Sequence, residues 1–142
     1  MSPKEAHLWR QRRKQLVEDH DPARLLAGWL AARGVRKVYR AREPLAVLED
    51  PAVIRSGLSD SRAGMSAADV VEGYVSRAQL SAVVRRHLLR AAGAPANVVL
   101  HVVEELPPDP VPPLLLAADL ADHDGPRELA RAEVIIHEAL AP

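Results

Sequence analysis

The segment Val98–Val103 constrains the fold of this chain more than any other. It reads Val-Val-Leu-His-Val-Val, a β-branched run that is long enough for a buried strand and too short for a helix. A second strand-forming segment lies at residues 69–75, and between the two Ser76 can cap a helix over residues 77–90 that Gly93 is expected to end. The pattern predicts strand, helix, strand, with a right-handed crossover if the strands pair in parallel.

Two helices and a basic strand are expected in the first forty residues. Residues 4–19 form a charged helix with few apolar positions. A second helix begins at Pro22, with Asp21 as its N-cap, and continues to Gly34, the expected stop. The basic run at residues 35–40 follows and is β-like.

Shorter elements and turns fill the rest of the chain. Residues 44–48 can form a helical turn, and residues 56–66 are rich in turn formers and have no period, which predicts a loop. Five prolines within Pro107–Pro113 predict an extended connector. Residues 114–121 are expected to form a short apolar helix, with a strand as the alternative, and Pro126 opens a last helix.

Together these elements predict an α+β fold. Its sheet is small, with two or three strands built from residues 69–75 and 98–103, and helices at 77–90 and 126–140 cover it. A basic helical segment at the N-terminus packs on this domain or is loosely tied to it. The edges of so small a sheet must be covered by helices or by a second copy of the chain, so a homodimer is expected.

Charge is distributed unevenly, although 19 Lys and Arg balance 19 Asp and Glu. Residues 1–42 carry eleven basic and four acidic residues, and residues 93–142 carry two and nine. We therefore divide the chain into a basic helical segment, 1–42, which could be the remnant of a winged helix, and an α+β domain, 43–142. Either the two ends neutralise each other, within one fold or across a head-to-tail dimer, or each end has its own partner.

The basic residues are the candidate nucleic-acid contacts, because clustered guanidinium groups release counterions from a phosphate backbone. A solvated charged face is the alternative explanation. Arg42 belongs to the same dense group, and Arg85, Arg86 and Arg90 form a smaller one. The candidate contacts are Arg10, Arg12, Arg13, Lys14, Arg33, Arg36, Lys37 and Arg40.

Catalytic and metal-binding motifs are scarce. The chain has no Cys, the six His lack zinc-type spacing, and the Gly-rich nucleotide loops and the serine nucleophile elbow are missing. Metal-type ligands cluster only at Asp119, Asp122, His123 and Asp124. Their spacing does not fit a calcium loop, and Asp124 can instead cap the helix that begins at Pro126. We expect no cofactor, no metal and no enzymatic activity, with a small metal-dependent enzyme as the least favoured alternative.

Several short motifs resemble the AbiEi-like group of type IV antitoxins, which accompany nucleotidyltransferase-like toxins. The resemblance covers roughly residues 50–140. It implies a bacterial regulator in which an N-terminal winged helix binds the operon's own promoter and the C-terminal part contributes to toxin antagonism; it transfers no catalytic residue. The motifs are Ser56–Met65 with Asp69–Val75, Asn97–Val103, and Ala117–Ala121 with Asp124–Glu128.

The sequence therefore predicts a non-enzymatic regulator or antitoxin-like binding module. DNA or RNA is expected at its basic end, and a cognate toxin or other protein at its acidic end. The charged start of the chain and the lack of a long apolar run predict a cytoplasmic protein without membrane contact. The alternative is a protein-interaction or scaffold module that binds no nucleic acid.

Overall fold

The computed structural model describes residues 2–65, 69–91 and 95–142. The chain forms two compact units, a helical unit of residues 1–30 with 113–142 and a sheet unit of residues 31–112. This division differs from the boundary after residue 42 that charge indicates, because strand β1 (Val35–Arg40) pairs with β4 (Arg90–Ala91) and β5 (Val98–Val103). It therefore belongs to the sheet unit.

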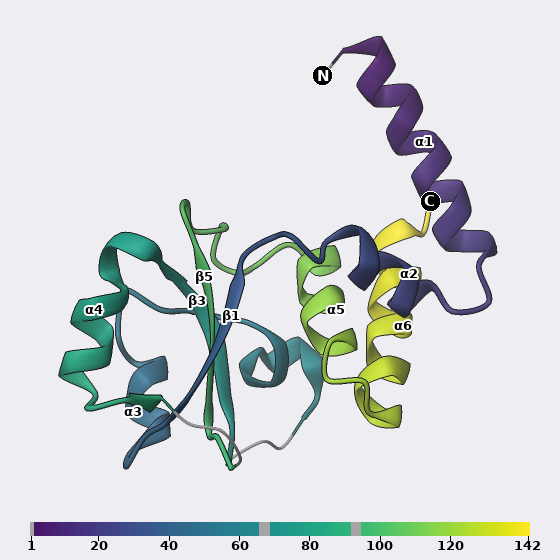
Figure 1. Cartoon of the computed structure of the whole chain (residues 1–142). Helices are drawn as coiled ribbons and strands as arrows, with labels where there is room; N and C mark the ends of the chain where they lie inside the picture. Colours follow the sequence, from purple (N-terminus) through teal and green to yellow (C-terminus); the bar gives the residue numbers. More distant parts are fainter. Residues whose placement is uncertain (1, 66–68, 92–94) are drawn as a thin grey trace. The chain divides into compact units, whose positions relative to one another are not determined.

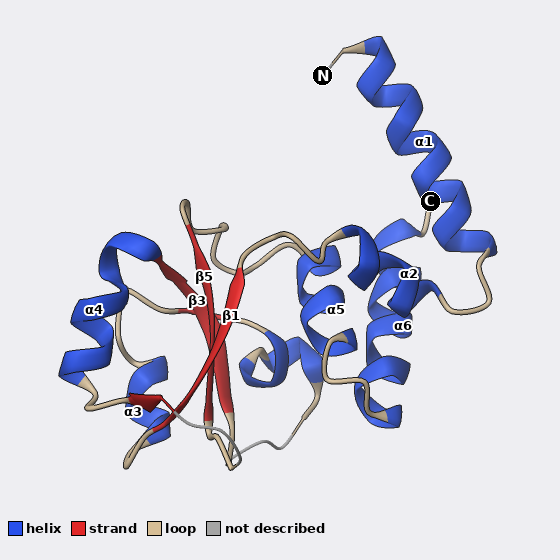
Figure 2. Cartoon of the chain, viewed as in Figure 1, coloured by secondary structure: helices blue, strands red, loops and turns tan. Residues whose placement is uncertain are grey.

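A five-stranded mixed sheet is the centre of the sheet unit (Figures 1 and 2). Its order is β2-β3-β5-β1-β4; β3 and β5 are parallel, and the other pairs are antiparallel. The predicted class, a sheet combined with helices, is confirmed. The expected number of strands, two or three, is wrong. The strands missed are short: β2 and β4 have two residues each, too few for a periodic pattern. The other bounds are β2 (Ile54–Arg55), β3 (Val71–Ser76), β4 (Arg90–Ala91) and β5 (Val98–Val103).

The predicted strand-helix-strand unit is present as β3, α4 (Arg77–Arg86) and β5. Ser76 caps α4, since its Oγ accepts a hydrogen bond of 3.3 Å from the backbone N–H of Gln79. The helix ends earlier than residue 90, because Leu88 adopts a left-handed conformation with φ of 51° and the chain turns into β4. Gly93, the expected stop, lies outside the described residues.

One face of the sheet carries the apolar core of this unit. Val102 of β5 lies in it, together with Val83 of α4 and Val47 of α3 (Pro44–Leu48), and both helices lie on this side (Figure 1). Val99 points to the opposite face, as strand alternation requires. Val99 and Val102 are both buried, as the sequence predicts for a buried strand.

The turn-rich segment before β3 is more regular than the predicted loop. It contains two 3₁₀ turns, η1 (Gly57–Ser59) and η2 (Ser61–Ala63). Asp60 caps the second, because its carboxylate accepts a hydrogen bond of 2.9 Å from the backbone N–H of Arg62.

The two ends of the chain together build the helical unit. α5 packs against α6, and α2 packs against both of them, around buried side chains such as Leu26, Leu116 and Ile136. The bounds are α1 (Pro3–Glu18), α2 (Pro22–Trp29), α5 (Pro113–Ala121) and α6 (Pro126–Leu140). None of the helices in the described part of the chain is long and apolar enough to cross a bilayer.

The helix ends in this unit agree only partly with those expected from the sequence. Asp21 caps α2 as predicted, but α2 ends at Trp29, just after Gly28, a residue of weak helix propensity, and not near Gly34. The N-cap of α6 is Gly125 and not Asp124. Asp124 has φ of 55°, so its backbone is left-handed and its side chain points elsewhere.

Candidate nucleic-acid interface

Five cations gather at the β1–β4 edge of the sheet unit. The strand register places Arg40 directly opposite Arg90. Arg36 lies on the same face of β1 as Arg40, Lys37 lies on the other face, and Arg42 follows the strand. All five side chains are exposed, and none has a hydrogen bond or ion pair with another described residue.

A pair of arginines directly opposite each other is costly in an antiparallel ladder. Like charges at such positions repel and destabilise the sheet. An anion held between the two guanidinium groups would relieve this repulsion, and phosphate suits their planar donors. Cations on an edge strand also discourage sheet-to-sheet aggregation, but that role does not require two of them to face each other.

Two of the basic residues of α1 that were expected to contact nucleic acid make contacts within the protein. Arg10 and Lys14 are exposed and have no partner among the described residues. The Arg12 guanidinium lies 5.7 Å from the centroid of the Trp29 ring, a cation–π contact. Arg13 donates a hydrogen bond to the backbone carbonyl of Leu140. Two of the four predicted contacts on α1 therefore support packing in the helical unit.

The eight predicted contacts are thus divided between the two units. Arg10, Arg12, Arg13 and Lys14 belong to the helical unit, while Arg33, Arg36, Lys37 and Arg40 belong to the sheet unit. Arg33 is half-buried and has interactions within the protein. Arg90 joins the second group through strand pairing fifty residues away in the chain, which sequence spacing alone could not show.

Part of the charge gradient is cancelled inside the helical unit. Arg24 of α2 donates hydrogen bonds of 3.2 and 3.0 Å from Nε and Nη2 to Oδ1 of Asp124, and one of 2.9 Å to Asp21. The bonds to Asp124 and then to Asp21 raise the pKa of Arg24. The helical unit has eight basic and ten acidic residues, and the sheet unit has eleven and nine. Residues 1–30 and 113–142 therefore neutralise part of each other's charge, whereas the five basic residues of 31–42 lie in the sheet unit.

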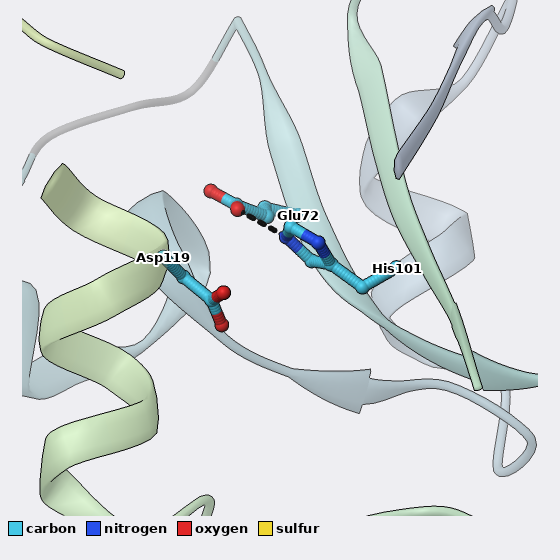
Figure 3. A group of neighbouring side chains, drawn as sticks. All are labelled: Glu72, His101 and Asp119. Atoms are coloured by element: carbon cyan, nitrogen blue, oxygen red, sulfur yellow. Dashed lines mark hydrogen bonds and ion pairs between the residues drawn. The ribbon is translucent and has the colours of Figure 1, made fainter. Parts of the chain in front are cut away.

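A buried carboxylate–imidazole pair lies on the sheet face opposite the core (Figure 3). Nε2 of His101 on β5 is 2.6 Å from Oε2 of Glu72 on β3. The Tyr74 ring stacks on His101 with the centroids 4.9 Å apart. The backbone N–H of Leu58 donates to Oε1 of Glu72 over 3.1 Å, and Ser59 Oγ accepts from the Glu72 N–H. The pair thus fixes η1 against β3.

Asp50 ties the end of α3 to the end of α4. Its carboxylate accepts two bonds from Arg86, of 3.0 and 3.2 Å, and lies 2.8 Å from Nε2 of His87. Burial alone would raise the pKa of Asp50, but the Ala52 N–H, His87 and Arg86 together hold it below its usual value. An open cavity of about 540 Å³ lies over this cluster.

The ion pair between Asp60 and Arg62 links η2 to the proline-rich connector through Arg62. The pKa of Asp60 is lowered: burial opposes ionisation, but the side-chain and backbone hydrogen bonds from Arg62 outweigh it. Arg62 also donates a bond of 2.7 Å to the carbonyl of Val111. Every buried side-chain polar atom in the described ranges has a hydrogen-bond partner, which is typical of structural clusters.

The acidic residues near the end of α5 do not assemble as a metal site would require. Asp119 is buried on α5, Asp122 and Asp124 are exposed, and Asp124 binds Arg24. Asp119 is drawn in Figure 3 and belongs to the helical unit. Taking each unit by itself, no three described carboxylate or imidazole side chains come close enough to share one ion.

Comparison of the chain with protein-family models, with curated proteins and with solved structures finds no match.

Proposed function

We propose that this protein is a non-enzymatic regulator of the antitoxin-like kind that binds nucleic acid through the β1–β4 edge of its sheet unit. The observation that carries the proposal is the directly opposed pair Arg40 and Arg90. Arg36, Lys37 and Arg42 extend this cationic edge, and none of the five is neutralised by a described carboxylate.

The contacts of this edge are with phosphate and not with bases. Its side chains are cations, and only 3% of the chain is aromatic, so stacking on unpaired bases contributes little. Phosphate contacts give affinity with little choice of sequence. In the antitoxin-like proposal, a cytoplasmic nucleotidyltransferase-like toxin is the second partner and binds the acidic C-terminal part of the chain.

Salt dependence of duplex DNA binding tests the nucleic-acid proposal. Five phosphate contacts give a slope of about −4.5 in log affinity against log salt. The double variant Arg40→Ala with Arg90→Ala is expected to flatten the slope to about −2.7, because two contacts are lost. Arg55→Ala is the matched control, since Arg55 is an exposed arginine on β2 at the opposite edge.

Two results would overturn this proposal. One is the absence of binding by the intact protein at about 50 mM salt, where phosphate contacts are strong. The other is an equal loss of affinity in the Arg55→Ala control and in the double variant, because the β1–β4 edge would then have no special role.

A second candidate function is a protein-interaction module that binds no nucleic acid. The Arg24–Asp124 ion pair favours it, because the basic N-terminal segment is partly neutralised by the acidic C-terminal one. If this alternative holds, the intact protein shows no affinity for duplex DNA even at about 50 mM salt, where phosphate contacts are strong.

A further inference from the structure

The two arginines that oppose each other at the β1–β4 edge extend from one face of the sheet. Tyr39 belongs to the apolar core on the other face, so the side chain of Arg40, the next residue along β1, points away from that core. Residues directly opposite each other in an antiparallel pair have Cβ atoms about 5 Å apart, and Arg90 is the residue opposite Arg40. Two guanidinium groups therefore extend from neighbouring points on the same face.

Asn97, the residue before β5, fixes the end of β1. Its Oδ1 accepts a hydrogen bond of 2.7 Å from the backbone N–H of Ala41, and its Nδ2 donates one of 2.8 Å to the carbonyl of the same residue. The backbone N–H of Asn97 donates to the carbonyl of Tyr39 over 3.0 Å. Because Asn97 is buried, water does not compete for these bonds, and the backbone is held on both sides of Arg40. A side chain on a fixed backbone loses less freedom when it binds a ligand.

The chain reaches Arg90 through a strained turn. Leu88 has φ of 51°, a left-handed conformation that is unfavourable for leucine, and it is 75% exposed. The turn places Leu89 in the apolar core and Arg90 on the opposite face, across from Arg40. Backbone strain of this kind is concentrated at active sites and ligand clamps. Two unfavourable features, the strained turn and the opposed cations, thus coincide at this pair.

The charge and the donors of the pair match a phosphomonoester better than a phosphodiester. Neither Arg40 nor Arg90 is neutralised by a described carboxylate, so the pair carries two positive charges. A phosphomonoester carries a charge of about −1.5 to −2 at pH 7 and has three acceptor oxygens, whereas each phosphodiester within a strand carries one charge. Each planar guanidinium can donate two parallel hydrogen bonds to a phosphate. A dianion therefore uses the donors of both arginines and cancels their repulsion.

We propose that Arg40 and Arg90 form a clamp for a phosphomonoester, whose source is the terminal phosphate of a nucleic acid strand bound along β1. This inference rests on the proposed function and deepens it, because it assigns strand ends as the preferred ligand of the cationic edge. Arg36 lies four residues before Arg40 on the same face of β1, about 13 Å away. Nucleotides in one strand rise about 3.4 Å each, so Arg36 contacts a phosphodiester about four nucleotides from the end.

Duplexes of one sequence with different ends test the clamp. Their affinities are compared at one salt concentration when the ends carry a 5′-phosphate, a 3′-phosphate or only hydroxyl groups. The wild type is expected to bind a phosphorylated duplex at least about fivefold more tightly than the hydroxyl duplex, because the clamp gains charge-assisted hydrogen bonds. Arg40→Ala with Arg90→Ala should lose this preference. Arg36→Ala with Arg42→Ala is the matched control, since it should weaken binding to every duplex equally and keep the preference.

Three results would overturn the clamp and leave the proposed function intact. The first is equal affinity of the wild type for all the duplexes. The second is a preference for phosphorylated ends that survives in the Arg40→Ala, Arg90→Ala variant. The third is a preference that is lost equally in the Arg36→Ala, Arg42→Ala control.

Binding of adenosine monophosphate, with adenosine as its control, separates the two sources of a phosphomonoester. If no duplex binds but the wild type binds the monophosphate and the Arg40→Ala, Arg90→Ala variant does not, the proposed function fails and the clamp stands, with a free nucleotide as its ligand. If neither the duplexes nor the monophosphate binds, the clamp is overturned together with the proposed function.

Discussion

Buried carboxylates in the sheet unit are hydrogen-bonded to partners distant in the chain. Glu72 meets His101, and Asp50 meets Arg86 and His87. A buried charge without such partners would cost several kcal/mol, so these side chains fix how η1, β3, α3 and α4 are placed. Because each pair joins residues about thirty or more apart, spacing along the sequence could not predict them.

Gly57 is the residue most sensitive to this arrangement. Its φ is +53°, and a Cβ there would lie 1.9 Å from Oε1 of Glu72. Gly57→Ala combines the left-handed cost of about 1–2 kcal/mol with overpacking of about 1–3 kcal/mol. Gly64→Ala is the control, because Gly64 has φ of +67° with nothing within 4 Å of its Cβ, and should cost only the first part. Urea unfolding measures the free energy of unfolding of both variants. Equal losses of stability would contradict the close approach of Gly57 to Glu72.

The lowered pKa of Asp50 predicts a pH-dependent contribution to stability. Its folded-state pKa lies below the unfolded value of about 3.9, so the stabilisation is present above that value and is lost as pH falls through the folded pKa. At pH 7 Asp50→Asn is expected to lower the free energy of unfolding by about 1–3 kcal/mol, towards the lower end because Arg86 is half exposed.

Urea unfolding of wild type and Asp50→Asn from pH 7 to pH 2 measures this contribution. The difference between the two proteins should shrink in acid, where the carboxyl is protonated. Glu105→Gln, at an exposed position, should show no comparable difference at any pH. A difference that stays constant down to pH 2 would show that the charge of Asp50 is not what stabilises the fold.

At the scale of elements, periodic segments were predictable and contact-dependent ones were not. The valine run of β5, the caps Ser76 and Asp21, and the helices α1 and α6 follow local rules that the chain obeys. β2 and β4 exist only through pairing with β3 and β1, and α4 stops at a left-handed Leu88 that no stop signal marks. At the cationic edge, Arg36, Lys37, Arg40 and Arg42 are close together in the sequence, whereas Arg90 joins them only through the strand register.

The β1–β4 edge predicts opposite effects on stability and on binding. Arg90→Glu replaces a repulsive cross-strand pair with an attractive one opposite Arg40, which is worth about 0.2–1 kcal/mol. The melting temperature should therefore rise by up to about 4 °C, while the affinity for duplex DNA falls. Arg55→Glu is the control, because Arg55 lies opposite Gly73 and has no repulsion to relieve. A lower melting temperature for Arg90→Glu would contradict the register.

At the scale of the whole molecule, the order of elements along the chain hides which of them fold together. The sheet unit is one continuous segment, residues 31–112, whereas the helical unit is assembled from residues 1–30 and 113–142. A division by charge separates these two ends, but they share an apolar core around Leu26, Leu116 and Ile136, and Arg24 pairs with Asp124 on the surface. The charge gradient along the sequence, which indicates two partners, is therefore also compatible with an ion pair inside the helical unit.

This arrangement predicts how fragments of the chain behave. Residues 31–112 contain the whole apolar core of the sheet, so this fragment should unfold cooperatively in urea. Residues 113–142 are too few to bury a core alone, and without α2 they leave the face of α5 and α6 uncovered. They should be mostly unfolded by circular dichroism and gain helix when a peptide of residues 1–30 is added. A control peptide with Leu26→Asp, which charges a buried contact position, should produce no gain. A helical 113–142 fragment that ignores both peptides would show that the two ends fold independently.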